Sequence, residues 1–136
     1  MGLVEITPNK EKAKSILTMC NVTLDMIKEI NPKYASNIIK EYYEVLRELS
    51  TIILLLDGYK STGEGAHKNI IDYIEGKNIL TEYEIILFND LREKRNRIAY
   101  DGFVITESFL KRKNKDILKI IDTLKKYIAT STESSN

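Results

Sequence analysis

The chain is short of the residues on which many functional sites depend. It has one cysteine, Cys20, and one histidine, His67, among its 136 residues. A single cysteine excludes an internal disulfide bond. The two residues together are also too few for a zinc site, which needs three or four ligands. We therefore expect no bound metal and no cofactor.

Long apolar runs and net charge are also lacking. The longest strongly apolar run, Ile52–Leu56, is far shorter than the roughly 20 residues that cross a bilayer. The first residues lack the charged start and apolar segment of a signal peptide, which together with the single cysteine predicts a cytoplasmic protein without membrane contact. Lys and Arg number 21 against 20 Asp and Glu, so any nucleic-acid binding depends on local patches of charge.

Proline is scarce and marks two helix starts. Only Pro8 and Pro32 occur, and apolar residues recur after each at spacings of three and four. This pattern predicts helices over about 8–29 and 33–57, with Thr7 as the cap of the first helix. The second helix is apolar nearly all round in its second half, so we expect it to be the central element. No segment shows a convincing strand-like alternation.

Glycines and capping residues delimit three further helices. The segment 58–65 is rich in glycine and predicts a loop, and the expected helices are 66–75, a fourth capped by Thr81 and ended by Gly102, and a fifth from Thr106 to about Ala129. We thus predict an all-α antiparallel bundle of about five helices. It forms a single domain over 1–130, followed by a disordered polar tail at 131–136.

The end of the fourth helix is crowded with cations. Arg92, Lys94, Arg95 and Arg97 lie within one and a half turns, against the single acid Glu93. At about 100° per residue, Lys94 and Arg95 fall on the apolar face of the helix, where an unpaired charge is costly. We expect this face to open into a groove, a subunit interface or an acidic partner. The alternative is a solvated helix end, where the macrodipole favours cations.

Other polar residues join this candidate site. Asn96 and Tyr100 lie one turn apart on a different side of the fourth helix. His67 and Lys68 stand at the start of the third helix. His67 either packs against a neighbouring helix or makes a polar contact near the basic residues, and the sequence leaves both readings open.

A family resemblance rests on two segments. LLLDGYKSTGEGAHKNIIDYI at 54–74, followed by LREKRNRIAYDG at 91–102, resembles the HEPN superfamily of small helical domains. The usual signature of that family is R-x4-6-H, often written RNRIAH. Arg95 matches its arginine and Asn96 the polar residue that follows, whereas Tyr100 stands in the place of the histidine.

The resemblance implies a homodimer whose paired motifs meet and form a metal-independent ribonuclease site, with Arg95 and Tyr100 in the catalytic positions. Many members of the family are toxins or partners of small nucleotidyltransferases. The tyrosine changes this chemistry. A phenol with a pKa near 10 stays protonated at neutral pH, whereas an imidazole with a pKa near 6.5 transfers protons there.

Our leading hypothesis is a dimeric RNA- or nucleotide-binding domain that is at most a weak ribonuclease. Arg95 would contact a phosphate, Asn96 and Tyr100 would orient it, and Arg92, Arg97 and Lys68 would add positive potential. One alternative is a protein-binding module, such as a partner of a small nucleotidyltransferase, that docks through Lys94 and Arg95 without nucleic acid. The other is an active metal-independent ribonuclease.

Overall fold

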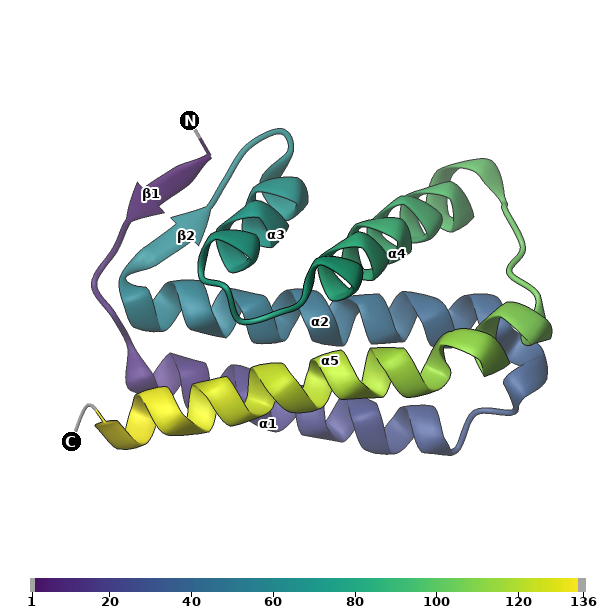
Figure 1. Cartoon of the computed structure of the whole chain (residues 1–136), viewed down its shortest axis with the longest axis horizontal. Helices are drawn as coiled ribbons and strands as arrows, with labels where there is room; N and C mark the ends of the chain where they lie inside the picture. The colour runs from purple at the N-terminus through teal and green to yellow at the C-terminus, as the bar shows by residue number, and fades with distance from the viewer. Residues whose placement is uncertain (1, 135–136) are drawn as a thin grey trace.

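The computed structural model describes residues 2–134 and confirms the predicted all-α bundle (Figure 1). A single turn of 3-10 helix, η1, connects the first two helices, and two short strands pair beside the bundle. The elements are β1 (Leu3–Glu5), α1 (Lys10–Lys28), η1 (Pro32–Tyr34), α2 (Ala35–Asp57), β2 (Tyr59–Ser61), α3 (Ala66–Gly76), α4 (Glu82–Asp101) and α5 (Glu107–Ser134).

Helix α2 forms the centre of the molecule, as predicted. Helices α1 and α5 run along one side of it, and α3 and α4 cover the other side (Figure 1). Leu46, Leu49 and Ile52 of α2 are each 0% exposed, because helices pack on both sides of α2. A helix that is apolar on every side is stable only when neighbours cover every side.

The caps predicted for the later helices are present. The Thr81 hydroxyl accepts a hydrogen bond from the Glu84 N–H at 3.1 Å, and the Glu84 carboxylate accepts one from the Thr81 N–H at 2.9 Å. Gly102 ends α4 with a left-handed φ of 66°, a conformation that costs glycine little. The Thr106 hydroxyl accepts from the Phe109 N–H at the start of α5. Thr81 and Gly102 thus fix the two ends of α4.

The prediction missed a two-stranded sheet and misplaced the start of the first helix. Strand β1 pairs antiparallel with β2 inside the predicted loop, and the Ile6 N–H continues the pairing by donating to the Gly58 carbonyl at 2.8 Å. The chain is therefore still extended at Thr7, and Asn9 caps α1 instead by accepting from the Lys12 N–H. Strands of three residues are too short to show alternation.

Helix α5 is longer than predicted. It continues through Ser134 instead of ending near Ala129, so 131–134 of the predicted disordered tail are helical, while 135–136 lie outside the described residues. No glycine or proline follows Gly102, and therefore nothing stops the helix where its apolar pattern ends. None of the described helices is both long and apolar enough to span a membrane.

The packing of α4 onto α2 predicts unequal effects of two substitutions on α4. Leu91 is 0% exposed and Ile86 is 59% exposed. We expect Leu91→Ala to lower the free energy of unfolding by about 2–5 kcal/mol, because it leaves a cavity in the core. Ile86→Ala should change it by less than about 0.5 kcal/mol. Urea denaturation followed by circular dichroism measures both, and equal effects would contradict the placement of α4.

Candidate functional site

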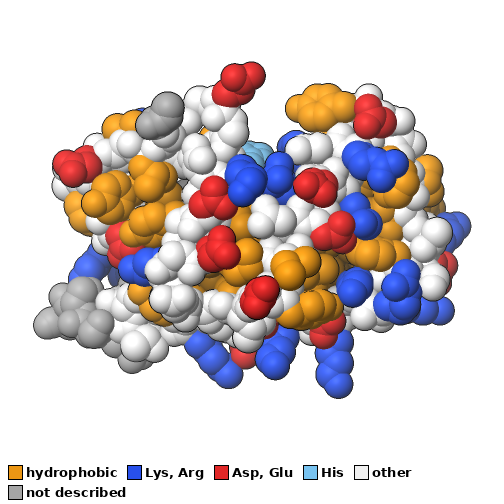
Figure 2. Space-filling model, turned by 45° about the horizontal axis from the view of Figure 1, so that its top comes forward, with side chains coloured by type: hydrophobic (Ala, Val, Ile, Leu, Met, Phe, Trp, Pro, Cys, Tyr) orange, Lys and Arg blue, Asp and Glu red, His pale blue; other side chains and the backbone are white. Residues whose placement is uncertain are grey.

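A notch opens between α3 and α4 above the middle of α2. The two helices are joined by a short turn and diverge from it (Figure 1). Figure 2 shows the surface hollowed between them, with the histidine side chain lying in the hollow beside Lys and Arg side chains. We call this site the notch and define it by His67 of α3 and the residues around it: Glu44 and Arg47 of α2, Arg92 and Arg95 of α4, and the fully buried Tyr43 beneath.

A charged network on α2 forms the floor of the notch. The Arg47 guanidinium donates through Nη2 to Glu44 Oε2 at 2.9 Å and to Glu48 Oε1 at 2.7 Å. Burial raises the pKa of Glu44, but the hydrogen bond from Arg47 and the charges of Arg47 and Arg95 outweigh it and lower the pKa overall. Glu44 is therefore ionised at neutral pH and holds Arg47 in place.

The arginines of α4 are only loosely paired. Arg95 Nε lies 3.9 Å from Glu44 Oε1, and Arg95 Nη1 donates to Asn96 Oδ1 at 3.3 Å. Arg92 Nη2 lies 3.9 Å from Glu93 Oε1. A guanidinium carries five N–H donors, and these contacts engage few of them. Since the Arg92 and Arg95 side chains are 18% and 27% exposed, both still reach the solvent of the notch.

Several buried polar atoms in and around the notch have no hydrogen-bond partner. Among the described residues these are Tyr43 Oη, Glu44 Oε1, Arg47 Nε, Asn89 Oδ1 and Arg92 Nε. Folded proteins pair nearly all buried polar groups, with protein, water or ligand. Their concentration in one region indicates that ordered solvent or a bound polar molecule completes the network.

His67 enters the notch from the first turn of α3. Its ring lies 5.9 Å from the Tyr43 ring, centre to centre. Burial lowers the pKa of His67, and the positive charges of Arg47, Arg95 and Arg92 lower it further, against the opposing charge of Glu44. The imidazole is thus neutral at pH 7. His67 packs against Tyr43 of α2, as the first interpretation expected, and it lies within electrostatic reach of Arg95, while the polar contact of the second interpretation stays a prediction.

Lys94 lies outside the notch. The prediction that its charge requires a groove, a subunit interface or an acidic partner is wrong for this residue. Its ammonium donates to both carboxylate oxygens of Asp90, at 2.9 and 3.1 Å, one turn earlier on α4. It also lies 4.9 Å from the centre of the Phe109 ring of α5. Lys94 therefore needs no partner from outside the bundle, since Asp90 and Phe109 already stabilise its charge.

Two other predicted cations also have partners away from the notch. The Arg97 guanidinium stacks 3.9 Å from the centre of the Phe103 ring, and the Lys68 ammonium donates to Asp72 at 2.9 Å, one turn along α3. Both remain at the surface. They add positive potential around the site without lining it.

The Tyr100 side chain lies at the surface and is 80% exposed. Within residues 2–134 its hydroxyl makes no hydrogen bond. It follows Asn96 by one turn on the same face of α4, and the Asn96 amide already contacts Arg95. Tyr100 is thus separate from the buried network and available to another molecule.

The floor of the notch was not predicted from the sequence. Tyr43, Glu44 and Arg47 belong to the helix that is apolar nearly all round, where they resemble ordinary breaks in the pattern. One signal was present: an acid and an arginine three residues apart, Glu44 and Arg47, interrupt the most buried helix of the chain. Charges in such a helix must be paired or face an opening.

Neither a thiol nor a metal cluster adds chemistry to the site. Cys20 is buried in the core, and burial raises the pKa of its thiol to about 11, so it is a poor nucleophile. Within residues 2–134, no three His, Cys, Asp or Glu side chains gather in a way that could hold a metal ion. The chemistry of the notch therefore rests on arginine, carboxylate, phenol and imidazole groups.

The charges around His67 predict how its pKa responds to substitution. Arg95→Met should raise the pKa of His67, because it removes a positive charge that disfavours the protonated ring. Glu44→Gln should lower it, because it removes a stabilising negative charge. The chain has one histidine, so an NMR titration reports it without assignment. Lys115→Met, on the surface of α5, is the control, and a pKa equal in all variants would contradict this geometry.

Comparison with known proteins identifies no relative of this chain. No family model matches it, and neither the curated proteins nor the solved structures contain a match. The resemblance to the HEPN superfamily therefore stays a prediction from the sequence. What the notch does has to be argued from its own residues.

Proposed function

We propose that the notch binds a phosphate group of RNA or of a nucleotide. The observation that carries this proposal is the convergence of Arg47, Arg92 and Arg95 around an open site, where the partly exposed Arg92 and Arg95 guanidiniums keep N–H donors that no acceptor among the described residues engages. Arginine binds phosphate oxygens through two parallel N–H donors, which makes it the residue best suited to such a group. A phosphate oxygen would satisfy the donors that the protein leaves without partners.

The carboxylates of the notch fit this role because they position the arginines without neutralising all of them. Glu44 and Glu48 hold Arg47 at hydrogen-bond distance, whereas Arg92 and Arg95 are each 3.9 Å from an acid. An anion that enters would therefore meet two arginines whose donors are mostly unused. It would still be repelled by the charge of Glu44. A single phosphate should therefore bind weakly, and a longer polyanion, which also contacts other cations, should bind more tightly.

The surface beside the notch supports a polynucleotide over a single phosphate. Lys and Arg side chains gather over the end of the molecule where α4 finishes and α5 begins (Figure 2). Arg112 and Lys94 flank the Phe109 ring near this end, and Lys113 lies over Tyr83 at the start of α4. Phosphate contacts of this kind give affinity without selecting a base sequence.

The HEPN resemblance adds two elements to the proposal. It implies that two copies pair with their motifs facing each other, which would place the exposed Tyr100 in a shared site. It also implies RNA cleavage without metal. We propose a homodimer with at most weak cleavage, because Tyr100 replaces the motif histidine and lies outside the buried network.

RNA binding should depend strongly on salt and on the arginines of the notch. We expect Arg95→Ala or Arg92→Ala to weaken binding of a short single-stranded RNA by about 10- to 100-fold, because each removes charge-assisted hydrogen bonds. Each substitution should also make the logarithm of the affinity depend less steeply on the logarithm of salt concentration. Fluorescence anisotropy between about 50 and 200 mM salt measures both effects.

Lys14→Ala is the matched control for this experiment, because it removes one positive charge from the exposed face of α1. Binding that is insensitive to salt and to Arg95 would overturn the proposal and favour the protein-binding alternative. Light scattering on the same sample reports whether the binding species is a dimer. Gel analysis of the RNA after incubation with a chelator shows whether cleavage without metal occurs and whether Arg95→Ala removes it.

A phosphodiester bound in the notch should couple RNA affinity to pH through His67. The negative charge of the RNA favours the protonated imidazole, so binding raises the pKa of His67 from its depressed value in the free protein. Affinity should therefore increase as pH falls through the raised pKa of the complex, and level off below the pKa of the free protein. Anisotropy titrations between about pH 5 and pH 8 test this. His67→Gln should abolish the dependence, and an unchanged dependence would place the RNA elsewhere.

A further inference from the structure

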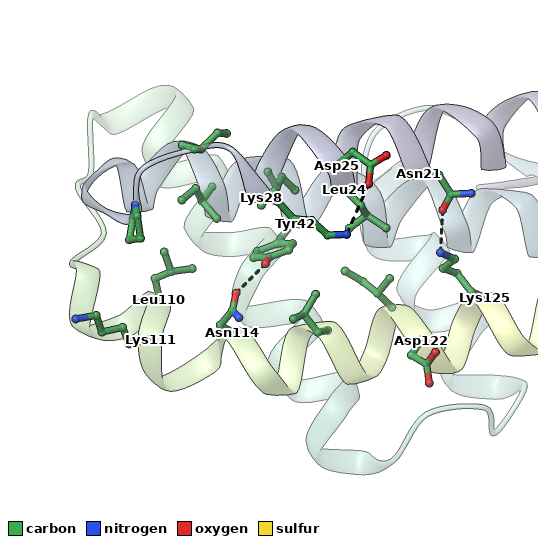
Figure 3. Close-up of a pocket in the computed structure, with 16 residues that line it drawn as sticks. Asn21, Leu24, Asp25, Lys28, Tyr42, Leu110, Lys111, Asn114, Asp122 and Lys125 are labelled. Atoms are coloured by element: carbon green, nitrogen blue, oxygen red, sulfur yellow. Dashed lines mark hydrogen bonds and ion pairs between the residues drawn. The ribbon is translucent and has the colours of Figure 1, made fainter.

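A second opening lies on the other side of α2, between α1 and α5. Its cavity volume is about 910 Å³, and its apolar walls come from Leu24, Ile27, Ile38, Leu110, Leu118 and Ile121. Figure 3 shows α1 and α5 on either side of this groove, with the Tyr42 side chain between them. A volume of this size falls in the range of small-molecule sites, roughly 300–1,000 Å³.

The groove is bounded along its length. At one end the Lys125 ammonium of α5 donates to Asn21 Oδ1 of α1 at 2.8 Å, so a hydrogen bond joins the two walls (Figure 3). Pro32 of η1 contributes to the lining where α1 gives way to α2. The bridge between Lys125 and Asn21 thus limits the length of apolar surface that is open to an occupant. The groove thus favours a smaller occupant.

One polar pair lies among the apolar walls. The Tyr42 hydroxyl donates to Asn114 Oδ1 at 2.7 Å, and this bond fixes the orientation of the amide. Both residues line the groove. The Asn114 Nδ2 group makes no hydrogen bond to any residue between 2 and 134, although the side chain is half-buried. Its two N–H donors are therefore available to an acceptor on a bound molecule.

The charges at the rim are largely engaged with neighbours on their own helices. Lys28 lies 3.7 Å from Asp25, Lys111 lies 3.7 Å from Glu107, and Asp122 lies 3.0 Å from Lys126. An ionised head group beside Asn114 would lose its water among apolar side chains, and it would have to compete with Glu107 for Lys111, one turn earlier on α5, which is unfavourable. The groove therefore favours a ligand without charge.

We propose that this groove binds a neutral, elongated apolar molecule that carries one hydrogen-bond acceptor, such as a long-chain alcohol, ester or amide. The acceptor oxygen takes a hydrogen bond from Asn114 Nδ2. The chain lies against Leu24, Leu118 and Ile121 and buries the exposed surface of Leu24 and Leu118. Leu118 is 42% exposed in the free protein. This site is independent of the notch, because α2 separates the two (Figure 1).

Calorimetric titration of the full chain with decan-1-ol tests the proposal, with Leu118→Trp as the blocking variant. The indole fills the groove, and we expect it to weaken binding about tenfold or more by excluding the chain. Ile86→Trp is the matched control, because it places the same side chain at an exposed position of α4 away from the groove. Circular dichroism establishes that both variants fold.

A second variant tests the anchor separately from the walls. Asn114→Asp retains an oxygen for the Tyr42 hydroxyl but removes both N–H donors, and it should weaken decan-1-ol binding by up to about tenfold. Decanoate should bind more weakly than the alcohol. No binding of decan-1-ol, equal binding in Leu118→Trp, or tighter binding of decanoate would each overturn the proposal. Self-association that Leu118→Trp abolishes, without alcohol binding, would instead assign the groove to a second copy of the chain.

Discussion

The fold requires that other helices cover α2 on every side. This helix is apolar nearly all round, so four other helices must pack against it, two on each side. The few polar groups that α2 carries cannot face solvent directly, and each has to meet a neighbour or an opening between neighbours. The notch and the groove both occur where this happens. Tyr43 meets His67 of α3 on one side, and Tyr42 faces the space between α1 and α5.

Helices and caps were predictable because their determinants are local. Thr81, Thr106 and Gly102 act within one turn of their own helix, so the sequence shows them directly. The sheet and the start of α1 were not predictable in this way. They depend on Ile6 meeting Gly58, which lies more than fifty residues away in the chain. Helix α5 exceeded its predicted length because its apolar pattern ends before any residue that breaks a helix.

The candidate site was only partly predictable for the same reason. The cation cluster of α4 predicted Arg92 and Arg95, which line the notch, as site residues. Their positions on the helix did not distinguish them from Lys94. That distinction depends on Asp90 and on the ring of Phe109. The floor of the notch and the placement of His67 against Tyr43 are tertiary properties, since they bring together side chains of α2, α3 and α4.

Tyr42 and Tyr43 are consecutive residues whose side chains point to different sides of α2. One hydroxyl holds Asn114 of α5, and the other lies near the arginines, with no hydrogen-bond partner among the described residues. Successive side chains on a helix point about 100° apart, and the helix backbone keeps this relative orientation fixed. Any rotation of α2 about its long axis thus moves both phenols together, so neither opening can be reshaped by such a rotation without disturbing the other.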